Sequence, residues 1–247
     1  MTQKLVEYSS DNGVATIALN RTDKRNAISI PMAEELRDCF LRFAASEDRV
    51  AVLCSNDDKI FCAGADLHEP PEMVWQAVPE IGFTTDKPII AAVNKRAIGV
   101  AVVLISMCDF MVVSEETIIH YPEAQLGFSG GLITAATKRM PLRLAMEIIM
   151  IGDPISGRRA YETGYANRIV EPGKEREEAL AMARRMADNA PLVVTGSKRM
   201  LLDAVGKTPA EAQYAMQIAS DRMMNSEDSE RGLVAWRNKT KPVFVGR

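Results

Sequence analysis

The sequence contains few of the residues that build metal sites and disulfide frameworks. Histidine occurs only at His68 and His120, and none of the four cysteines belongs to a C-x-x-C pair. Structural zinc sites take several histidine and cysteine ligands at short spacings, and small disulfide scaffolds are rich in cysteine. We therefore expect no metal ion, and we expect the cysteines to be reduced thiols, mostly within the core.

The chain also lacks a surplus of basic residues and a long apolar stretch. Its formal net charge is -3, whereas nucleic-acid binding requires an excess of basic surface. No run approaches the roughly 18 apolar residues of a membrane span, and the first residues lack the basic and apolar regions of a secretory signal. We therefore expect a cytoplasmic protein with no nucleic-acid partner and no membrane segment.

What the chain does have is an apolar pattern that changes between strand and helix periods. The turn at Asp11-Asn12-Gly13 predicts an antiparallel hairpin, and Ser29 followed by Pro31 predicts the start of a helix. Strands are predicted at 3–9, 13–19, 50–54, 60–62, 88–93, 109–113, 117–120 and 165–170. Helices are predicted at 29–45, 70–83, 100–107, 130–138, 142–150, 156–163, 173–188, 191–204, 208–225 and 227–237.

The order of these elements predicts an α/β core followed by a helical region. A β-β-α order repeats in the first half of the chain, and helices dominate the second half. We place the boundary at Asn189-Ala190-Pro191, which divides the chain into residues 1–190 and residues 191–247. The last helices carry apolar faces that two helices cannot bury alone, so we expect them to pack on the core or on another subunit.

Two loops of small residues each follow an apolar strand. They are Phe61-Cys62-Ala63-Gly64-Ala65-Asp66 and Ala97-Ile98-Gly99-Val100-Ala101. Small side chains allow backbone N–H groups to approach a ligand closely, and a loop that opens a helix directs those donors at negative charge. The pattern fits two loops that converge on one oxygen, and it fits two ordinary tight turns equally well.

The order of motifs along the chain resembles that of the crotonase superfamily, in particular the enoyl-CoA hydratase/isomerase family. The resemblance runs from about residue 5 to 190, and two later segments resemble the family's terminal helices. The matching motifs are Asp23-Lys24-Arg25-Asn26-Ala27-Ile28-Ser29, Phe61-Cys62-Ala63-Gly64-Ala65-Asp66-Leu67, Lys87-Pro88-Ile89-Ile90-Ala91-Ala92-Val93-Asn94, Ala97-Ile98-Gly99, Met107-Cys108-Asp109, Tyr121-Pro122-Glu123-Ala124-Gln125-Leu126-Gly127, Thr195-Gly196-Ser197-Lys198 and Glu230-Arg231-Gly232-Leu233-Val234-Ala235-Trp236.

This resemblance implies a crotonase-like spiral of ββα repeats with a C-terminal helical region that forms trimers, often paired into hexamers. It also implies an acyl-coenzyme A thioester substrate, whose enolate oxygen is held by two backbone N–H groups. Mapped onto this sequence, those donors belong to Ala65 and Val100. No cofactor is implied, because coenzyme A is part of the substrate.

One departure from the family pattern concerns the acids. Hydratases of the family use two glutamates, and this sequence keeps only the second, Glu123, while Val103 occupies the position of the first. Addition of water benefits from two carboxylates, whereas one carboxylate can remove a proton from one carbon and return it two carbons away. The pattern is similar to that of Δ3-Δ2-enoyl-CoA isomerases, so we expect a 1,3-proton shift carried out by Glu123.

Other functions remain open at this point. A hydratase is possible if His120, His68, Glu69 or Glu72 supplies a second acid, although a structural histidine and solvated charges are the ordinary interpretation. A hydrolase, lyase or decarboxylase could share the enolate strategy. A member without catalytic activity could keep only the fold and the binding of acyl-CoA.

The resemblance also proposes residues that bind the substrate. Lys24 and Arg25 precede Ala27, where the family cradles the coenzyme, although a surface pair beside a helix explains them equally well. Lys239 is a candidate for the coenzyme phosphates. Three residues of the first loop motif complete the set, namely Ala63, Asp66 and Leu67, of which Asp66 is expected to orient its loop rather than react.

Overall fold

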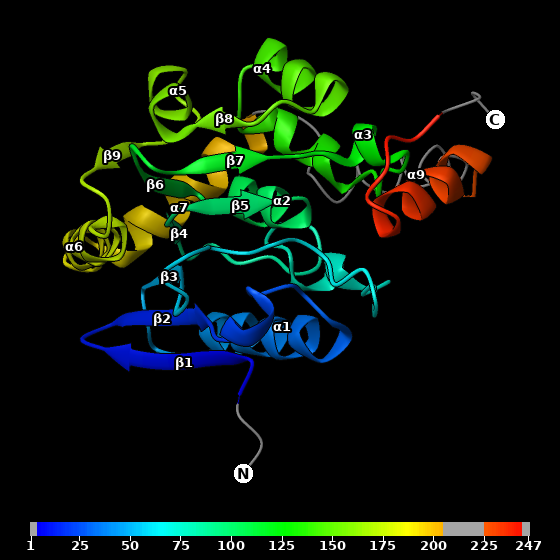
Figure 1. Cartoon of the computed structure of the whole chain (residues 1–247). Helices are drawn as coiled ribbons and strands as arrows, with labels where there is room; N and C mark the ends of the chain where they lie inside the picture. Colours follow the sequence, from blue (N-terminus) through cyan, green and yellow to red (C-terminus); the bar gives the residue numbers. More distant parts are fainter. Residues whose placement is uncertain (1–3, 205–224, 244–247) are drawn as a thin grey trace.

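A computed structural model describes residues 4–204 and 225–243, and its core is built on two β-sheets (Figure 1). The larger sheet has the order β1-β2-β3-β4-β6-β9, in which β1 and β2 are antiparallel and the other pairs are parallel. Its strands are β1 (Val6–Asp11), β2 (Val14–Leu19), β3 (Val50–Ser55), β4 (Ile89–Val93), β6 (Phe110–Ser114) and β9 (Arg168–Val170). The smaller sheet contains β5 (Arg96–Ile98), β7 (Ile118–His120) and β8 (Ile155–Ser156).

Successive repeats advance through both sheets together. One repeat runs from β4 through β5 into helix α2 (Val100–Met107), and the next runs from β6 through β7 into helix α3 (Glu123–Leu126). Strand β6 lies parallel beside β4, and β7 lies parallel beside β5. The chain therefore forms a spiral of β-β-α repeats, as the family resemblance implied.

The central strands of the larger sheet, β2, β3 and β4, are buried on both faces, which explains why they are almost entirely apolar. Ala51 and Leu53 of β3 face a core that helix α1 (Ile30–Ala45) contributes to, while Val50 and Val52 face a second core beneath helix α6 (Glu175–Ala187). Apolar residues at helical spacing on α1 and α6 complete these cores. They are Met32, Leu36, Phe40 and Phe43 on α1, and Ala179, Met182 and Ala183 on α6.

Several predicted helices take a different helical form. Residues 132–138 form a 3₁₀ helix, η3 (Leu132–Lys138), and the segment after α4 (Leu142–Met146) continues as a π-helix, η4 (Glu147–Ile151). Between residues 70 and 83 only η2 (Val74–Ala77) is helical, and its form is 3₁₀. Apolar side chains recur on one face in α, 3₁₀ and π helices alike. The apolar periodicity therefore predicted that these segments are helical but did not distinguish the type of helix.

The shortest elements of the structure were not predicted from the sequence. Strand β5 lies within a stretch interpreted as loop, and β8 and α3 were not predicted, because two to four residues carry no measurable period. The predicted strand at 60–62 is reduced to one bridge, from Cys62 to Ala97. Helices α5 (Gly157–Glu162), α7 (Pro191–Ala204) and α9 (Glu227–Arg237) lie where helices were predicted, whereas almost all of the one predicted at 208–225 lies outside the described residues.

All four cysteines are free thiols. In the described part of the chain, no helix combines the length and the apolar character that crossing a membrane requires.

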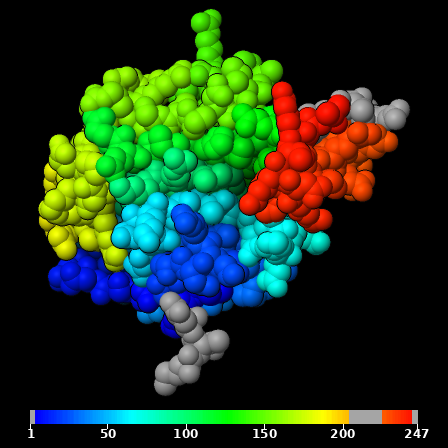
Figure 2. Space-filling view, viewed as in Figure 1, coloured from blue at the N-terminus to red at the C-terminus, as the bar shows by residue number. Residues whose placement is uncertain are grey.

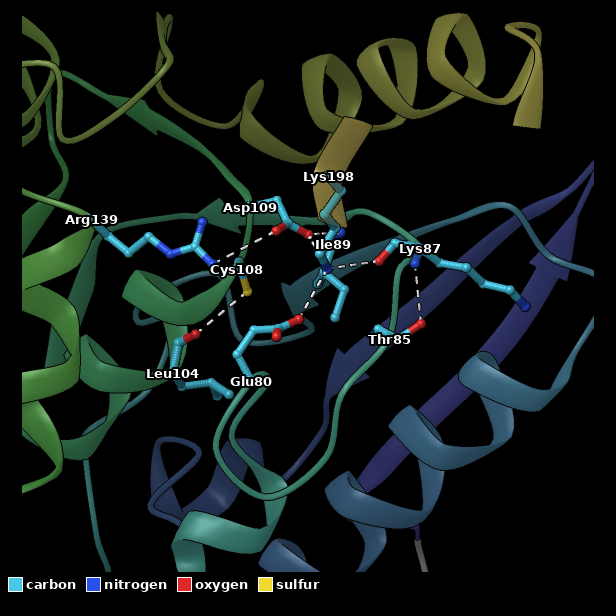
Figure 3. A network of polar contacts seen from close by, with 9 residues as sticks. All are labelled: Glu80, Thr85, Lys87, Ile89, Leu104, Cys108, Asp109, Arg139 and Lys198. Atoms are coloured by element: carbon cyan, nitrogen blue, oxygen red, sulfur yellow. Dashed lines mark hydrogen bonds and ion pairs between the residues drawn. The ribbon is translucent and has the colours of Figure 1, made fainter. Parts of the chain in front are cut away.

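A buried ion cluster joins α7 to the core (Figure 3). The Lys198 Nζ atom of α7 lies 2.9 Å from Asp109 Oδ2 and 3.3 Å from Glu80 Oε1, and it donates to the carbonyl oxygen of Lys87 at 3.1 Å. Each of the three charged side chains is at most 10% exposed. The Arg139 guanidinium lies 3.9 Å from the other oxygen of Asp109. Two cations thus balance two carboxylates beneath α7.

Replacement of Lys198 by methionine is expected to lower the free energy of unfolding by about 3 kcal/mol, because it leaves two buried carboxylates with one distant cation. Thermal unfolding followed by circular dichroism measures the effect. Lys174→Met is the matched control, since Lys174 pairs with Glu177 at the surface and such pairs contribute little. Equal melting temperatures for the two variants would contradict the assignment of the cluster as a stabilising contact.

Candidate active site

The two small-residue loops lie side by side. The N–H groups of Phe61 and Cys62 both donate to the carbonyl oxygen of Arg96, at 2.9 and 3.1 Å, and the Ile98 N–H donates to the Cys62 carbonyl at 3.0 Å. The first loop is held on its other side by Ile28, whose N–H donates to the Gly64 carbonyl at 2.8 Å. Backbone hydrogen bonds therefore fix the relative position of the loops.

Glycine is required where the loops meet. Gly64 and Gly99 have φ angles of +97° and +58°, in the region that L side chains rarely adopt. A β-carbon added at Gly64 would lie 2.9 Å from the Ile98 carbonyl oxygen and 3.7 Å from the Gly99 Cα. A side chain at residue 64 would therefore separate the two loops.

The residues that follow these glycines carry free backbone donors. Ala65 and Val100 are half-buried, and within the described part of the chain neither N–H donates a hydrogen bond to another group. Val100 is the first residue of α2, where N–H groups have no partner inside the helix and the helix dipole favours negative charge. Two adjacent loops therefore each carry one backbone N–H group without an acceptor among the described residues.

A polar scaffold that sequence reasoning missed supports the first loop. Arg21 Nη1 donates to Asp66 Oδ2 at 2.7 Å and to the Ala27 carbonyl at 2.8 Å. Asn26 is fully buried and donates to the Phe61 carbonyl at 2.9 Å. The hydrogen bond from Arg21 lowers the pKa of Asp66, so this carboxylate stays ionised and holds its loop. The only sequence signal for this role of Arg21 was its position, since it is a basic residue five positions before Asn26-Ala27.

The Cys62 thiol shapes the same loop. It donates to the Asn26 carbonyl at 3.0 Å and accepts the Gly64 N–H at 3.4 Å. Burial raises the pKa of this thiol to about 12, so it is neutral at physiological pH and poorly reactive. Cys62 is therefore a structural residue of the site.

Glu123 places a carboxyl group against the second loop. It is the first residue of α3 and only 7% exposed, and its Oε1 would lie 3.0 Å from a β-carbon added at Gly99. Its Oε2 is buried and has no hydrogen-bond partner among the described residues. Burial raises the pKa of Glu123 to about 8, so the carboxyl is present in both protonation states near neutral pH. Perturbed acids of this kind cluster at functional sites.

This raised pKa has a consequence for stability. Between the ordinary pKa of 4.5 and a value of about 8, the folded state retains a proton that the unfolded chain releases, so the free energy of unfolding falls as pH rises through that range. Glu123→Gln is therefore expected to melt at a higher temperature than the native protein at pH 8, with little difference at pH 5. Calorimetry at both pH values tests this, with exposed Glu72→Gln as control. A difference that does not change with pH would be inconsistent with a buried carboxyl.

The candidates for a second acid are either engaged in another contact or exposed. His120 Nε2 contacts the carbonyl oxygen of Gly152 at 2.9 Å, and the side chains of His68, Glu69 and Glu72 are exposed. The remaining position of interest, Val103, is an apolar residue of α2 that is 1% exposed. A buried tyrosine missed by sequence reasoning, Tyr121, lies near Glu123, and its pKa is raised by burial and by the charge of that carboxylate.

The predicted substrate-binding residues lie in the first loop, in the segment that precedes α1 and at the C-terminal end of the described chain. Lys24 and Arg25 are exposed, and the Arg25 carbonyl accepts the Ala63 N–H at 3.0 Å. Ala27, Ala63 and Leu67 are half-buried. Lys239 borders a cavity of about 590 Å³ together with His68, α3, Trp236 and Arg237. Figure 2 shows this C-terminal segment, in orange to red, lying along the side of the molecule.

A spiral of β-β-α repeats that sets two glycine loops beside one buried carboxyl group is the architecture of an acyl-CoA-processing enzyme with the crotonase fold. The model of the family described as enoyl-CoA hydratase/isomerase matches residues 9–247, and the chain belongs to this family. The family and the fold expected from the sequence are thereby confirmed.

Individual relatives cover the whole chain. The protein is 31% identical to the carnitinyl-CoA dehydratase of Proteus mirabilis (strain HI4320), with 100% of both chains aligned. It is similar to a solved carnitinyl-CoA dehydratase from Mycobacterium avium 104, with a TM-score of 0.89 and 29% identity over 99% of this chain and 100% of the other. A methylmalonyl CoA decarboxylase structure gives a TM-score of 0.85 and 25% identity, with 100% of both chains covered.

Proposed function

We propose that this enzyme isomerises enoyl-CoA thioesters, moving a double bond from the 3,4 to the 2,3 position with Glu123 as the proton carrier. The observation that carries the proposal is the buried Glu123 carboxyl, which lies against Gly99 and has one oxygen without a partner in residues 4–204 and 225–243. Val103, at the position where hydratases of the family have their first glutamate, offers no proton to exchange.

The chemistry follows from the positions of the donors and the acid. The N–H groups of Ala65 and Val100 would bind the thioester oxygen and stabilise the enolate by several kcal/mol. Glu123 would take a proton from C2 and return it to C4, so that the double bond moves and no atom is gained or lost. A pKa of about 8 suits a group that must accept and release the same proton near neutral pH.

The coenzyme half of the bound substrate is proposed to extend from the site past the first loop. Lys24 and Arg25 would meet the coenzyme at the exposed end, because cationic donors bind phosphate oxygens well. The other contacts proposed are with Ala27 and with residues of the loop itself, namely Ala63, Asp66 and Leu67. Lys239 would add a cation from the C-terminal cavity, beside Arg237.

Hydration or dehydration is the second candidate, favoured by the name of the carnitinyl-CoA dehydratases to which the chain is similar. This reaction would need a second group to hold water. His120 contacts Gly152, whereas Glu69 and Glu72 are exposed. The isomerase proposal therefore requires fewer changes of conformation.

Two substrates separate the candidates. Purified enzyme given 3-hexenoyl-CoA should increase the absorbance of the conjugated thioester, whereas trans-2-hexenoyl-CoA should persist. Loss of the conjugated absorbance with formation of a 3-hydroxyacyl-CoA would instead establish a hydratase. Tight binding of both thioesters without turnover would indicate an acyl-CoA-binding protein and would contradict both candidates.

The assembly is proposed to be a trimer or a dimer of trimers, as the family resemblance implies. Large apolar side chains of α7 support this because they are exposed in the single chain: Leu192, Val193, Met200 and Leu201. Light scattering of the purified protein tests the proposal, which requires the mass of three or six chains. The proposed reaction needs no cofactor, and the cytoplasmic location stays a prediction.

A further inference from the structure

Helix α3 cannot define the position of Glu123 by itself. It contains four residues, and a single helical turn is unstable without external contacts. On one side it packs against α9 so closely that a β-carbon added at Gly232 would lie 1.5 Å from the Leu126 carbonyl oxygen. The location of the Glu123 carboxyl therefore depends on the contacts that the flanking residues make.

Two side chains that flank Glu123 converge on one carbonyl group. His120 Nε2 lies 2.9 Å from the Gly152 carbonyl oxygen, and Gln125 Nε2 donates to the same oxygen at 3.1 Å. Gln125 Nε2 also lies 3.1 Å from the Ile151 carbonyl oxygen. These carbonyls end the π-helix η4, where carbonyl groups lack donors inside the helix.

The carbonyl group at Gly152 is presented by a backbone that only glycine adopts easily. Gly152 has φ +77°, and a β-carbon added there would lie 2.9 Å from Gln125 Nε2. A side chain at residue 152 would therefore push Gln125 away from its acceptors. The other end of the arrangement reaches the second loop, because the His120 carbonyl accepts the Gly99 N–H at 2.9 Å.

We propose that His120 and Gln125 are positioning residues that hold α3 on the end of the π-helix η4 and so keep the Glu123 carboxyl against Gly99. The inference rests on the proposed function in that Glu123 moves the proton. A displacement of about 1 Å in a catalytic group can cost about 10²-fold in rate, so two modest hydrogen bonds can control turnover. His120 thereby acts through its contact with Gly152 rather than as a proton donor.

The first test uses a reaction that needs only the base and the two amide donors. The enzyme is incubated with butyryl-CoA in D₂O, and the loss of the α-proton signal is followed by NMR. Gln125→Leu is expected to lower kcat for exchange about tenfold, with KM within about twofold of the native value. His120→Leu is expected to lower kcat by a similar factor. Gln125→Lys, which keeps an N–H donor, is expected to restore exchange.

The matched control is Asn56→Leu. Asn56 is an exposed amide whose Nδ2 donates to Glu7 Oε2 at 2.8 Å and to Asn20 Oδ1 at 3.2 Å, on a different edge of the protein. Its replacement removes the same kind of hydrogen bond and is expected to leave exchange unchanged. Equal exchange by Gln125→Leu and Asn56→Leu would overturn the inference.

A second measurement does not depend on turnover. The carboxyl band of Glu123, identified by its loss in Glu123→Gln, is titrated by difference infrared spectroscopy. Gln125→Leu is expected to move its midpoint from about 8 towards the ordinary value, because the carboxyl loses its buried location. An unchanged midpoint would overturn the inference even in an enzyme that exchanges no proton. Exchange without isomerisation of 3-hexenoyl-CoA would refute the proposed function and leave the positioning role intact.

Discussion

Glu123→Gln is expected to lower kcat about 10³-fold or more while the KM for the thioester changes by less than about threefold. Positioned general bases contribute 10² to 10⁴-fold, and a single carboxyl that both removes and returns the proton lies at the upper part of this range. Glutamine has nearly the same shape and cannot accept the proton. Steady-state kinetics with 3-hexenoyl-CoA gives both constants.

Two further substitutions make this result specific. Glu69→Gln and Glu72→Gln remove exposed carboxylates of the segment that follows the first loop. If Glu123 is the only proton carrier, both variants keep most of the native activity. If Glu123→Gln remained active while one of these variants lost activity, the base would have to be assigned to the 68–72 region.

Gly64→Ala is expected to reduce kcat about 10³-fold. The new β-carbon would meet the Ile98 carbonyl oxygen at 2.9 Å, and φ +97° disfavours any L side chain, so the backbone must move and the Ala65 N–H with it. Loss of one donor to an oxyanion costs about 10² to 10³-fold, and separation of the loops affects the donor of Val100 as well. Kinetics with 3-hexenoyl-CoA measures the loss of activity, and thermal unfolding measures any loss of stability separately.

Gly164→Ala separates backbone strain from contact between the loops. Gly164 also has a positive φ angle, +77°, and no atom would lie within 4 Å of its added β-carbon. This variant should lose some stability through strain and keep its kcat. Comparable losses of activity in the two variants would show that strain, and not the distance between the loops, controls catalysis.

The parts of the candidate site that the sequence predicted are those that a local motif encodes. Gly64, Gly99 and Glu123 stand next to strand ends, and the structure brings these three residues together. The contacts of Arg21 with Asp66 and of Gln125 with Gly152 join residues 45 and 27 positions apart, and nothing in either local pattern predicts the partner. Support for the candidate site is therefore a property of tertiary packing, whereas its proposed reactive groups are encoded locally.

The same distinction applies to the fold. Long strands such as β3 and β4 were predicted because both faces are buried and the residues are apolar throughout. The π-helical turn before Gly152 could not be predicted, since its apolar spacing matches that of an ordinary helix. The predicted boundary at 190/191 and the oligomeric role of residues 191–247 stay predictions.

The spiral arranges the reactive groups as a column. Cys62 pairs with Ala97 of β5, and Ile98 pairs with His120 of β7, so three consecutive turns of the chain present Ala65, Val100 and Glu123 just beyond neighbouring strand positions. Neighbouring strands lie about 4.8 Å apart, which is the scale on which one small functional group contacts the next. Each turn contributes one part of the proposed site, so replacement of the acid on the third turn leaves the backbone of the first two turns in place. In the proposed mechanism the pair of amide donors is thereby structurally separate from the acid.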